Sequence, residues 1–191
     1  MNSRCSAVLL AGGKSSRMGE NKVFINIDGV PLWRRQIQIL QQLQPVEIFV
    51  AGPAHQEWIH EDIIIIPDAQ PNAGPLAAVV SALRRCSAPL LLALAVDLPR
   101  MTGDYLAELL AFCTPDRGIV PRGQPLAAVY PAGARALAES CLRSSDRSMQ
   151  QFAMRCVTRG LVRLKEISLS ENALFANMNT PEDVELVSRN D

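Results

Sequence analysis

Short runs of apolar residues recur along the first half of the chain. They cover positions 6–11, 46–51, 62–66 and 90–96; the second mixes β-branched with aromatic residues, and the last two are almost wholly apolar. Runs of this length without a polar face are typical of strands that are buried on both sides, as in a parallel sheet. We therefore predict a strand at each of these positions.

Apolar residues at helical spacing fill the segments between these runs. The residues that share one helical face are Trp33, Ile37, Leu40 and Leu43 in the first segment, Leu76, Val79, Val80 and Leu83 in the second, and Leu106, Leu109, Leu110 and Cys113 in the third. Pro45 ends the first helix, Pro75 opens the second, and Thr102 caps the third. Strand and helix alternate, which predicts an α/β fold with a doubly wound, mostly parallel sheet.

The pattern loosens in the last third of the chain. Positions 117–120 and 125–130 have the character of two strands joined by a turn that contains Gly123, and helices are expected at 134–142 and 148–156. Two strands that follow each other through a short turn pair in opposite directions. We therefore expect a C-terminal antiparallel addition to the sheet.

The end of the chain carries a helix-start signal. A late strand is expected near 174–177, followed by a helix that Thr180 caps and in which Pro181 takes the first position. Neither an internal repeat nor a linker interrupts the chain. We expect residues 1–191 to form a single domain.

Composition and charge narrow the classes of partner. Lys and Arg together number 19, as do Asp and Glu, so the chain as a whole has no field that would hold a polyanion. The five cysteines are scattered and form no closely spaced metal or redox pair, which is typical of core residues in a reducing cytosol. No apolar run reaches the length of a bilayer span or a signal-peptide core. We expect a cytoplasmic protein that has neither nucleic acid nor membrane as partner.

The most informative segment is the polar loop after the first predicted strand. It contains Gly12 and Gly13 and three cations, Lys14, Arg17 and Lys22. Consecutive glycines let backbone N–H groups point into one concavity, which together with fixed cations binds phosphate. The spacing matches neither a P-loop nor a dinucleotide fingerprint. The alternative is a flexible polar loop with solvated lysines, but a phosphate site is favoured.

Asp97 is the second candidate from the residues alone. It follows the most apolar run and precedes Leu98 and Pro99, which puts it at the carboxyl edge of the sheet, where open α/β sheets bind ligands. A single carboxylate suffices for Mg²⁺ when phosphate oxygens and water complete its shell. An aspartate that merely turns the chain before proline is the alternative. The sequence alone leaves both open.

Four segments together resemble a known family. The loop 10–22 is similar to that of nucleotidyltransferases, which activate small molecules with a nucleoside triphosphate. The segments 74–77 (Gly-Pro-Leu-Ala), 96–99 (Val-Asp-Leu-Pro) and 177–183 (Asn-Met-Asn-Thr-Pro-Glu-Asp) follow in the expected order. The last of these narrows the resemblance to the molybdenum cofactor guanylyltransferase family. It implies a fold like that of the nucleotide-diphospho-sugar transferases.

The resemblance also implies residue roles. Arg17, Lys22 and Asp97 would be catalytic, with Asp97 holding Mg²⁺ as the cofactor. The nucleotide would contact Leu10, Ala11, Gly12, Gly13, Lys22, Asp68, Gly74 and Asp97, and the acceptor would contact Asn177 and Asn179. Ala78 departs from the family, which often has glycine there. The residues also permit plainer interpretations: Arg17 and Lys22 as solvated charges, Gly74 as a helix start, and the two asparagines as loop residues before a capped helix.

The resemblance implies transfer of GMP from GTP to the phosphate of molybdenum-molybdopterin, which releases pyrophosphate and forms the guanine dinucleotide cofactor. That acceptor is a phosphate monoester with a second pKa near about 6, so it needs no general base. We accordingly expect His55 and His60 to be surface residues. The alternatives are cytidylyl or other nucleotidyl transfer to a molybdopterin or small phosphate acceptor, and a non-catalytic nucleotide or pterin carrier. Molybdoenzymes or their chaperones are candidate protein partners.

Overall fold

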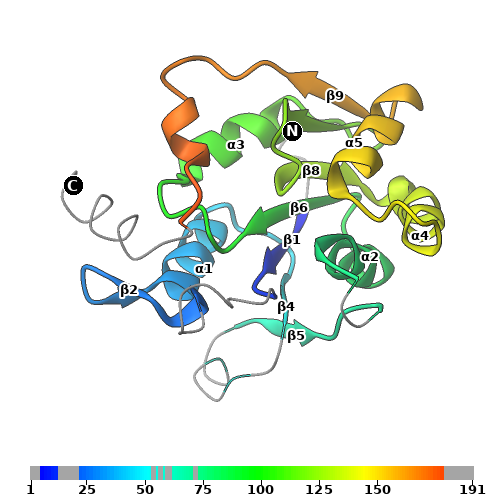
Figure 1. Cartoon of the computed structure of the whole chain (residues 1–191). Helices are drawn as coiled ribbons and strands as arrows, with labels where there is room; N and C mark the ends of the chain where they lie inside the picture. The colour runs from blue at the N-terminus through cyan, green and yellow to red at the C-terminus, as the bar shows by residue number, and fades with distance from the viewer. Residues whose placement is uncertain are drawn as a thin grey trace.

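A seven-stranded sheet runs through the middle of the molecule, with helices on both faces (Figure 1). The computed structural model describes residues 5–12, 22–52, 55, 58, 62–70 and 73–178. The strands lie in the order β5-β4-β1-β6-β8-β7-β9. In chain order they are β1 (Cys5–Leu10), β4 (Ile48–Ala51), β5 (Ile64–Ile66), β6 (Leu90–Ala95), β7 (Gly118–Pro121), β8 (Ala127–Pro131) and β9 (Val162–Lys165).

Every strand of the sheet except β8 runs in the same direction. β1 pairs in parallel with both β4 and β6, β4 with β5, and β7 with β9. β8 is antiparallel to both of its neighbours, β6 and β7. The predicted mostly parallel sheet with an antiparallel addition is confirmed. As a result, the carboxyl ends of all the parallel strands meet at one edge of the sheet.

The predicted helices are present, and two of them begin at signals that the sequence contains. They are α1 (Leu32–Gln42), α2 (Pro75–Arg85), α3 (Gly103–Ala111), α4 (Arg135–Arg143) and α5 (Met149–Thr158). Pro75 takes the first position of α2, and the Thr102 side chain accepts a hydrogen bond from the Tyr105 N–H at 3.3 Å at the start of α3. Both features were predicted, and both are confirmed.

Two hydrophobic clusters hold the helices against the sheet. Ala7 and Leu9 of β1 point to the face that α1 and α3 cover, whereas Val8 and Leu10 point to the face that α2, α4 and α5 cover (Figure 1). This alternation follows from the two-residue period of a strand. Because both faces are covered, the central strands have no polar face, and this explains their apolar sequences.

The prediction of a strand near 174–177 is wrong. Residues Asn172–Phe175 form a short 3₁₀ helix, η4, and the chain then runs irregularly to Met178. Phe175 and Met178 are buried in the cluster under α1 and α3, and the Met178 N–H donates to the Asp97 carbonyl oxygen at 3.0 Å. The apolar residues of this segment therefore anchor it to the core and do not extend the sheet.

Two strand pairings were not predicted. β9 is a sheet edge whose sequence, Val-Arg-Leu-Lys, has a single fully buried residue, so it contains no apolar run. β2 (Asn26–Ile27) and β3 (Val30–Pro31) form a small hairpin around Asp28 and Gly29, both with positive φ. An Asp-Gly pair between short strands is a hairpin signal, which the apolar pattern alone does not detect.

The cysteines fit the expectation that they pack as small apolar residues. All five are free, and four of them are buried. Burial raises the pKa of the Cys5 thiol to about 11 and that of the Cys113 and Cys156 thiols to about 12. Within the described part of the chain, no helix is both long and apolar enough to cross a membrane.

Candidate active site

The carboxyl edge of the sheet collects the described candidate residues. Leu10, Ala11 and Gly12 lie at the end of β1, Asp97 follows β6, and Asp68 follows β5. In open α/β sheets, ligands bind outside this edge. The end of β1 and Asp97 therefore lie on neighbouring strands, while Asp68 lies two strands from β1 along the same edge.

The end of β1 is fixed from both sides. The Ala11 N–H donates to the Ala51 carbonyl oxygen at 3.0 Å, and the Val96 N–H donates to the Leu10 carbonyl oxygen at 3.2 Å. Gly52 packs closely against the backbone of Ala11 and Gly12. A Cβ added to Gly52 would stand 3.3 Å from the Ala11 carbonyl carbon and from the Gly12 nitrogen. The exposed Gly12 backbone thus begins the polar loop from a rigid base.

The Asp97 turn is held by contacts from two distant segments. The Gln36 side chain of α1 is fully buried, and its Nε2 donates to the Leu98 carbonyl oxygen at 2.7 Å. From the other end of the chain, the Met178 N–H donates to the Asp97 carbonyl oxygen at 3.0 Å. Asp97 itself is half-buried. These contacts fix the backbone from which the carboxylate extends.

Gln36 was not singled out by the sequence. Its signal was a glutamine on the apolar face of a helix, three residues after Trp33 and next to Ile37. A buried amide requires hydrogen-bond partners. A polar residue at such a position is therefore a sign of a backbone group nearby that needs a donor.

Asp68 and Gly74 both precede α2, Asp68 just after β5 and Gly74 as the residue before the first turn of the helix. Burial raises the pKa of the half-buried Asp68 carboxyl. Gly74 precedes the helix with φ of 75° and ψ of −170°, a conformation that is nearly restricted to glycine. The Ala69 N–H donates to the Ala77 carbonyl oxygen at 3.3 Å, which ties the segment after β5 to the first turn of α2. The positive end of this helix therefore lies beside Asp68.

The structure brings only some of the predicted residues together. Asn177 is exposed and directly precedes Met178, so it stands next to the Asp97 turn. Lys22 begins a short 3₁₀ helix, η1 (Lys22–Phe24), but its side chain lies outside the described part. Gly13, Lys14, Arg17 and Asn179 also lie outside the described residues, as do Thr180, Pro181 and His60.

The small number of carboxylates at this edge fits a metal ion whose other ligands would be phosphate oxygens of the substrate and water. No group of three or more His, Cys, Asp or Glu side chains forms a metal site among the residues that the structure describes. Mg²⁺ in nucleotide sites is bound by one or two carboxylates together with phosphate oxygens and water. Asp97, a hard oxygen ligand at the ligand-binding edge, meets that requirement.

The sequence predicted that His55 would be a surface residue, but the structure shows it half-buried among aromatic rings. Its ring packs edge-on against Phe24, with centroids 4.6 Å apart, and against Trp58, with centroids 4.7 Å apart. Trp58 also lies 6.0 Å from Trp33 of α1. This aromatic cluster joins η1, which begins at Lys22, to the segment after β4.

Comparison with known proteins shows the family to which the chain belongs. The family model described as "MobA-like NTP transferase domain" matches residues 7–163. A "Probable molybdenum cofactor guanylyltransferase" of Opitutus terrae is 34% identical over 188 residues, which cover 95% of this chain and 93% of that protein. The molybdenum cofactor guanylyltransferase of Rhizobium rhizogenes is 31% identical over 92% of this chain and 87% of its own. The chain belongs to this family of MobA-like NTP transferases, the molybdenum cofactor guanylyltransferases.

Solved structures agree on the fold. A nucleotidyl transferase from Methanothermobacter superposes with a TM-score of 0.80 at 16% identity and covers 97% of this chain and 96% of its own. The molybdopterin-guanine dinucleotide biosynthesis protein A of Archaeoglobus fulgidus gives a TM-score of 0.73 at 21% identity, with 96% and 97% covered. The predicted nucleotidyltransferase-like fold is confirmed.

Proposed function

We propose that this chain transfers GMP from GTP to the phosphate of molybdenum-molybdopterin and releases pyrophosphate. Family membership supports the reaction class and the acceptor. The observation that carries the proposal is the Asp97 turn, which borders the end of β1 through Val96 and the segment before Asn179 through Met178. A carboxylate between a phosphate-binding loop and an acceptor-side segment is where two phosphates would react.

The reaction needs positioning more than proton transfer. An acceptor phosphate oxygen attacks the α-phosphorus of GTP and forms a new P–O–P link. The bond from the α-phosphorus to the bridging oxygen breaks, and pyrophosphate leaves with the electron pair. The acceptor is a dianion at neutral pH, because its second pKa is about 6. The barrier therefore lies in bringing anions together and stabilising the charge that develops.

Each candidate residue answers one part of this need. Asp97 would hold Mg²⁺, which supplies positive charge to the α-phosphate and the leaving pyrophosphate. Arg17 and Lys22 would neutralise the triphosphate. The backbone of Leu10, Ala11, Gly12 and Gly13 would receive the phosphates, Asp68 and Gly74 would border the nucleoside, and Asn177 and Asn179 would contact the acceptor.

We also propose a cytoplasmic location for this reaction. The free, buried cysteines support it, because disulfides are rare in reducing compartments. Molybdoenzymes or their chaperones stay the proposed protein partners, since the product must be passed to an enzyme that uses it.

The test is pyrophosphate release from each of the four nucleoside triphosphates, with and without molybdenum-loaded molybdopterin, in the presence and absence of Mg²⁺. We expect release only with GTP, acceptor and Mg²⁺ together, and calorimetric binding of GTP that is tighter than that of CTP, ATP or UTP. Faster turnover with CTP would replace the guanylyl assignment by the cytidylyl one. Tight GTP binding without any release would indicate a carrier.

A further inference from the structure

The last described segment, residues 166–178, connects two parts of the fold that are far apart. It leaves the sheet after β9, passes beside α3 and ends at the Asp97 turn (Figure 1). We call it the strap. Its last contact is the hydrogen bond from the Met178 N–H to the Asp97 carbonyl oxygen. The course of the strap therefore determines where Asn177 stands relative to Asp97.

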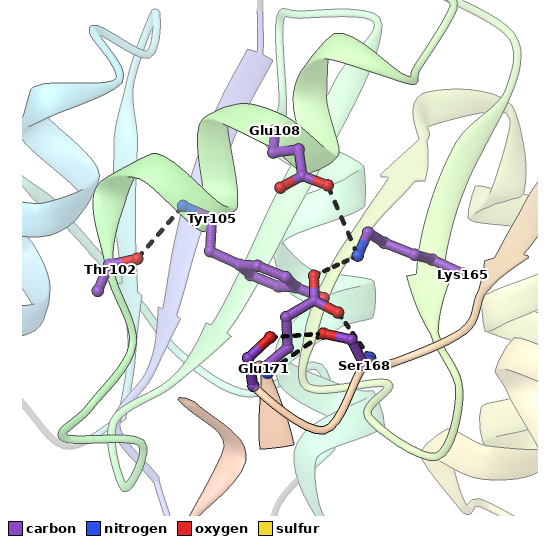
Figure 2. A network of polar contacts seen from close by, with 7 residues as sticks. Thr102, Tyr105, Glu108, Lys165, Ser168 and Glu171 are labelled. Carbon is purple, nitrogen blue, oxygen red and sulfur yellow. Dashed lines mark hydrogen bonds and ion pairs between the residues drawn. The ribbon is translucent and has the colours of Figure 1, made fainter. Parts of the chain in front are cut away.

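One carboxylate fastens the strap at its first bend. Glu171 Oε1 accepts a hydrogen bond from Lys165 Nζ at the end of β9, and Oε2 accepts one from the Ser168 N–H at 2.7 Å (Figure 2). In return, the Glu171 N–H donates to Ser168 Oγ at 3.3 Å. This reciprocal Ser-x-x-Glu arrangement has the hydrogen bonds of a capping box, and it closes the turn at 168–171 that leads into η4.

The same lysine joins the strap to α3. Lys165 Nζ lies 3.6 Å from Glu108 Oε1 and 5.1 Å from the centroid of the Tyr105 ring (Figure 2). The Tyr105 ring in turn packs edge-on against Phe175 of the strap, with centroids 5.5 Å apart. Lys165 and Glu171 are only 17% and 18% exposed, so their contact is shielded more than that of a surface pair.

The apolar anchors of the strap lie on both sides of its bend and not in it. Phe175 and Met178 are buried, and Ile167 and Leu174 pack partly buried against the same cluster, while Ser168, Leu169 and Ser170 are exposed. Segments with few buried apolar contacts open locally at low free energy. Loss of the Glu171 contacts should therefore let the strap open more often, including the Met178 hydrogen bond at its end.

We propose that Glu171, held by Lys165, is a positioning residue for the acceptor: it fastens the strap so that Asn177 stands beside Asp97. This inference rests on the proposed function, in which Asn177 contacts the acceptor. The nucleotide side of Asp97 is built from β1, β4 and β5, and among the described residues no hydrogen bond joins the strap to these strands. A loosened strap should consequently weaken use of the acceptor much more than it weakens GTP binding.

The matched pair of variants is Glu171→Gln and Glu166→Gln. Glu166 lies five residues earlier on the same strap, but its partner is the exposed Arg122, and the two side chains are 73% and 60% exposed. With saturating GTP, we expect Glu171→Gln to raise the KM for molybdenum-loaded molybdopterin by about fivefold or more, with the KM for GTP within about twofold. Glu166→Gln should leave both values unchanged. Lys165→Arg, which keeps the charge, should stay closer to the parent chain than Lys165→Met.

A second readout needs no acceptor. Amide hydrogen exchange at Met178 should be faster in Glu171→Gln than in Glu166→Gln, because the Met178 hydrogen bond closes the strap. Glu171→Gln that loses thermal stability but keeps its acceptor KM and its Met178 exchange would overturn the proposal. A parent chain that releases no pyrophosphate from GTP would overturn the proposed function and the acceptor role with it. In that case Met178 exchange would still report whether Glu171 holds the strap.

Discussion

Gln36 provides a hydrogen-bond donor inside a hydrophobic cluster, at the back of the Asp97 turn. Its Nε2 donates to the Leu98 carbonyl oxygen, while its Oε1 has no hydrogen-bond partner in the described part of the chain. A buried acceptor that loses its donor costs more than the hydrogen bond itself contributes. The residue is therefore expected to matter for both stability and the geometry of Asp97.

Replacement of Gln36 tests the contribution of this hydrogen bond to stability. Gln36→Met keeps the size of the side chain and removes the donor, so the Leu98 carbonyl oxygen stays buried without its partner. We expect the free energy of unfolding to fall by about 1–3 kcal/mol in urea titration. Gln38→Met, on the exposed side of the same helix, should change it by less than about 0.5 kcal/mol. Equal stabilities of the two variants would contradict the role of the contact.

The Glu171 contacts predict a pH dependence. The hydrogen bond from Lys165, with those from Ser168, lowers the pKa of the Glu171 carboxyl from 4.5 to about 2. Because the folded-state pKa is depressed, the stabilisation is present in full above the unfolded-state value and is lost as the pH falls from 4.5 towards 2. The difference in unfolding free energy between the parent chain and Glu171→Gln should be constant from pH 7 to pH 5 and shrink below pH 4.5. A difference that grows in acid would be the wrong sign.

At the scale of elements, the sequence predicted the buried strands and the helices with a clear start signal. β1, β4 and β6 were found because burial on both faces makes their sequences apolar, and α2 and α3 because Pro75 and Thr102 mark their starts. β5 was found from its three isoleucines, but the expected burial on both faces is wrong there, because β5 is an edge strand in which Ile64 is exposed. The edge strand β9 and the strap have no such signal, since their partners lie far along the chain. Likewise, the sequence indicated Asp97 as a site residue, whereas Gln36 and Glu171 become meaningful only through contacts that the fold creates.

Gly74 makes the start of α2 a testable element. Its φ of 75° with ψ of −170° is strained for any side chain, although an added Cβ would meet no neighbour within 4 Å. Gly74→Ala should therefore lower the free energy of unfolding by about 1–3 kcal/mol through backbone strain alone. Gly133→Ala, at an equally open position without positive φ, is the control and should be neutral or slightly stabilising. Thermal unfolding of both variants measures the two effects. A Gly74→Ala variant as stable as the parent chain would contradict the predicted backbone strain.

On the scale of the whole molecule, the sheet has two parts that meet at β6. β5, β4 and β1 carry the candidate nucleotide residues, while β8, β7 and β9 lead through the strap to Asn177, the proposed acceptor residue. Asp97 lies at the junction, directly after β6. This layout explains how a domain without a described cluster of metal ligands can perform phosphoryl chemistry: the substrates themselves would complete the metal site.

The most direct test of this account is the turnover of Asp97→Asn. The amide keeps the size of the side chain and removes the charge that would hold Mg²⁺. Asp116→Asn is the control, because Asp116 is exposed in the turn before β7, at the opposite edge of the sheet. With GTP, Mg²⁺ and acceptor, we predict that Asp97→Asn loses on the order of 100-fold or more in turnover, equivalent to about 2.7 kcal/mol of transition-state stabilisation, at unchanged circular dichroism. Activity within a few-fold of both the parent chain and Asp116→Asn would contradict the assignment of Asp97.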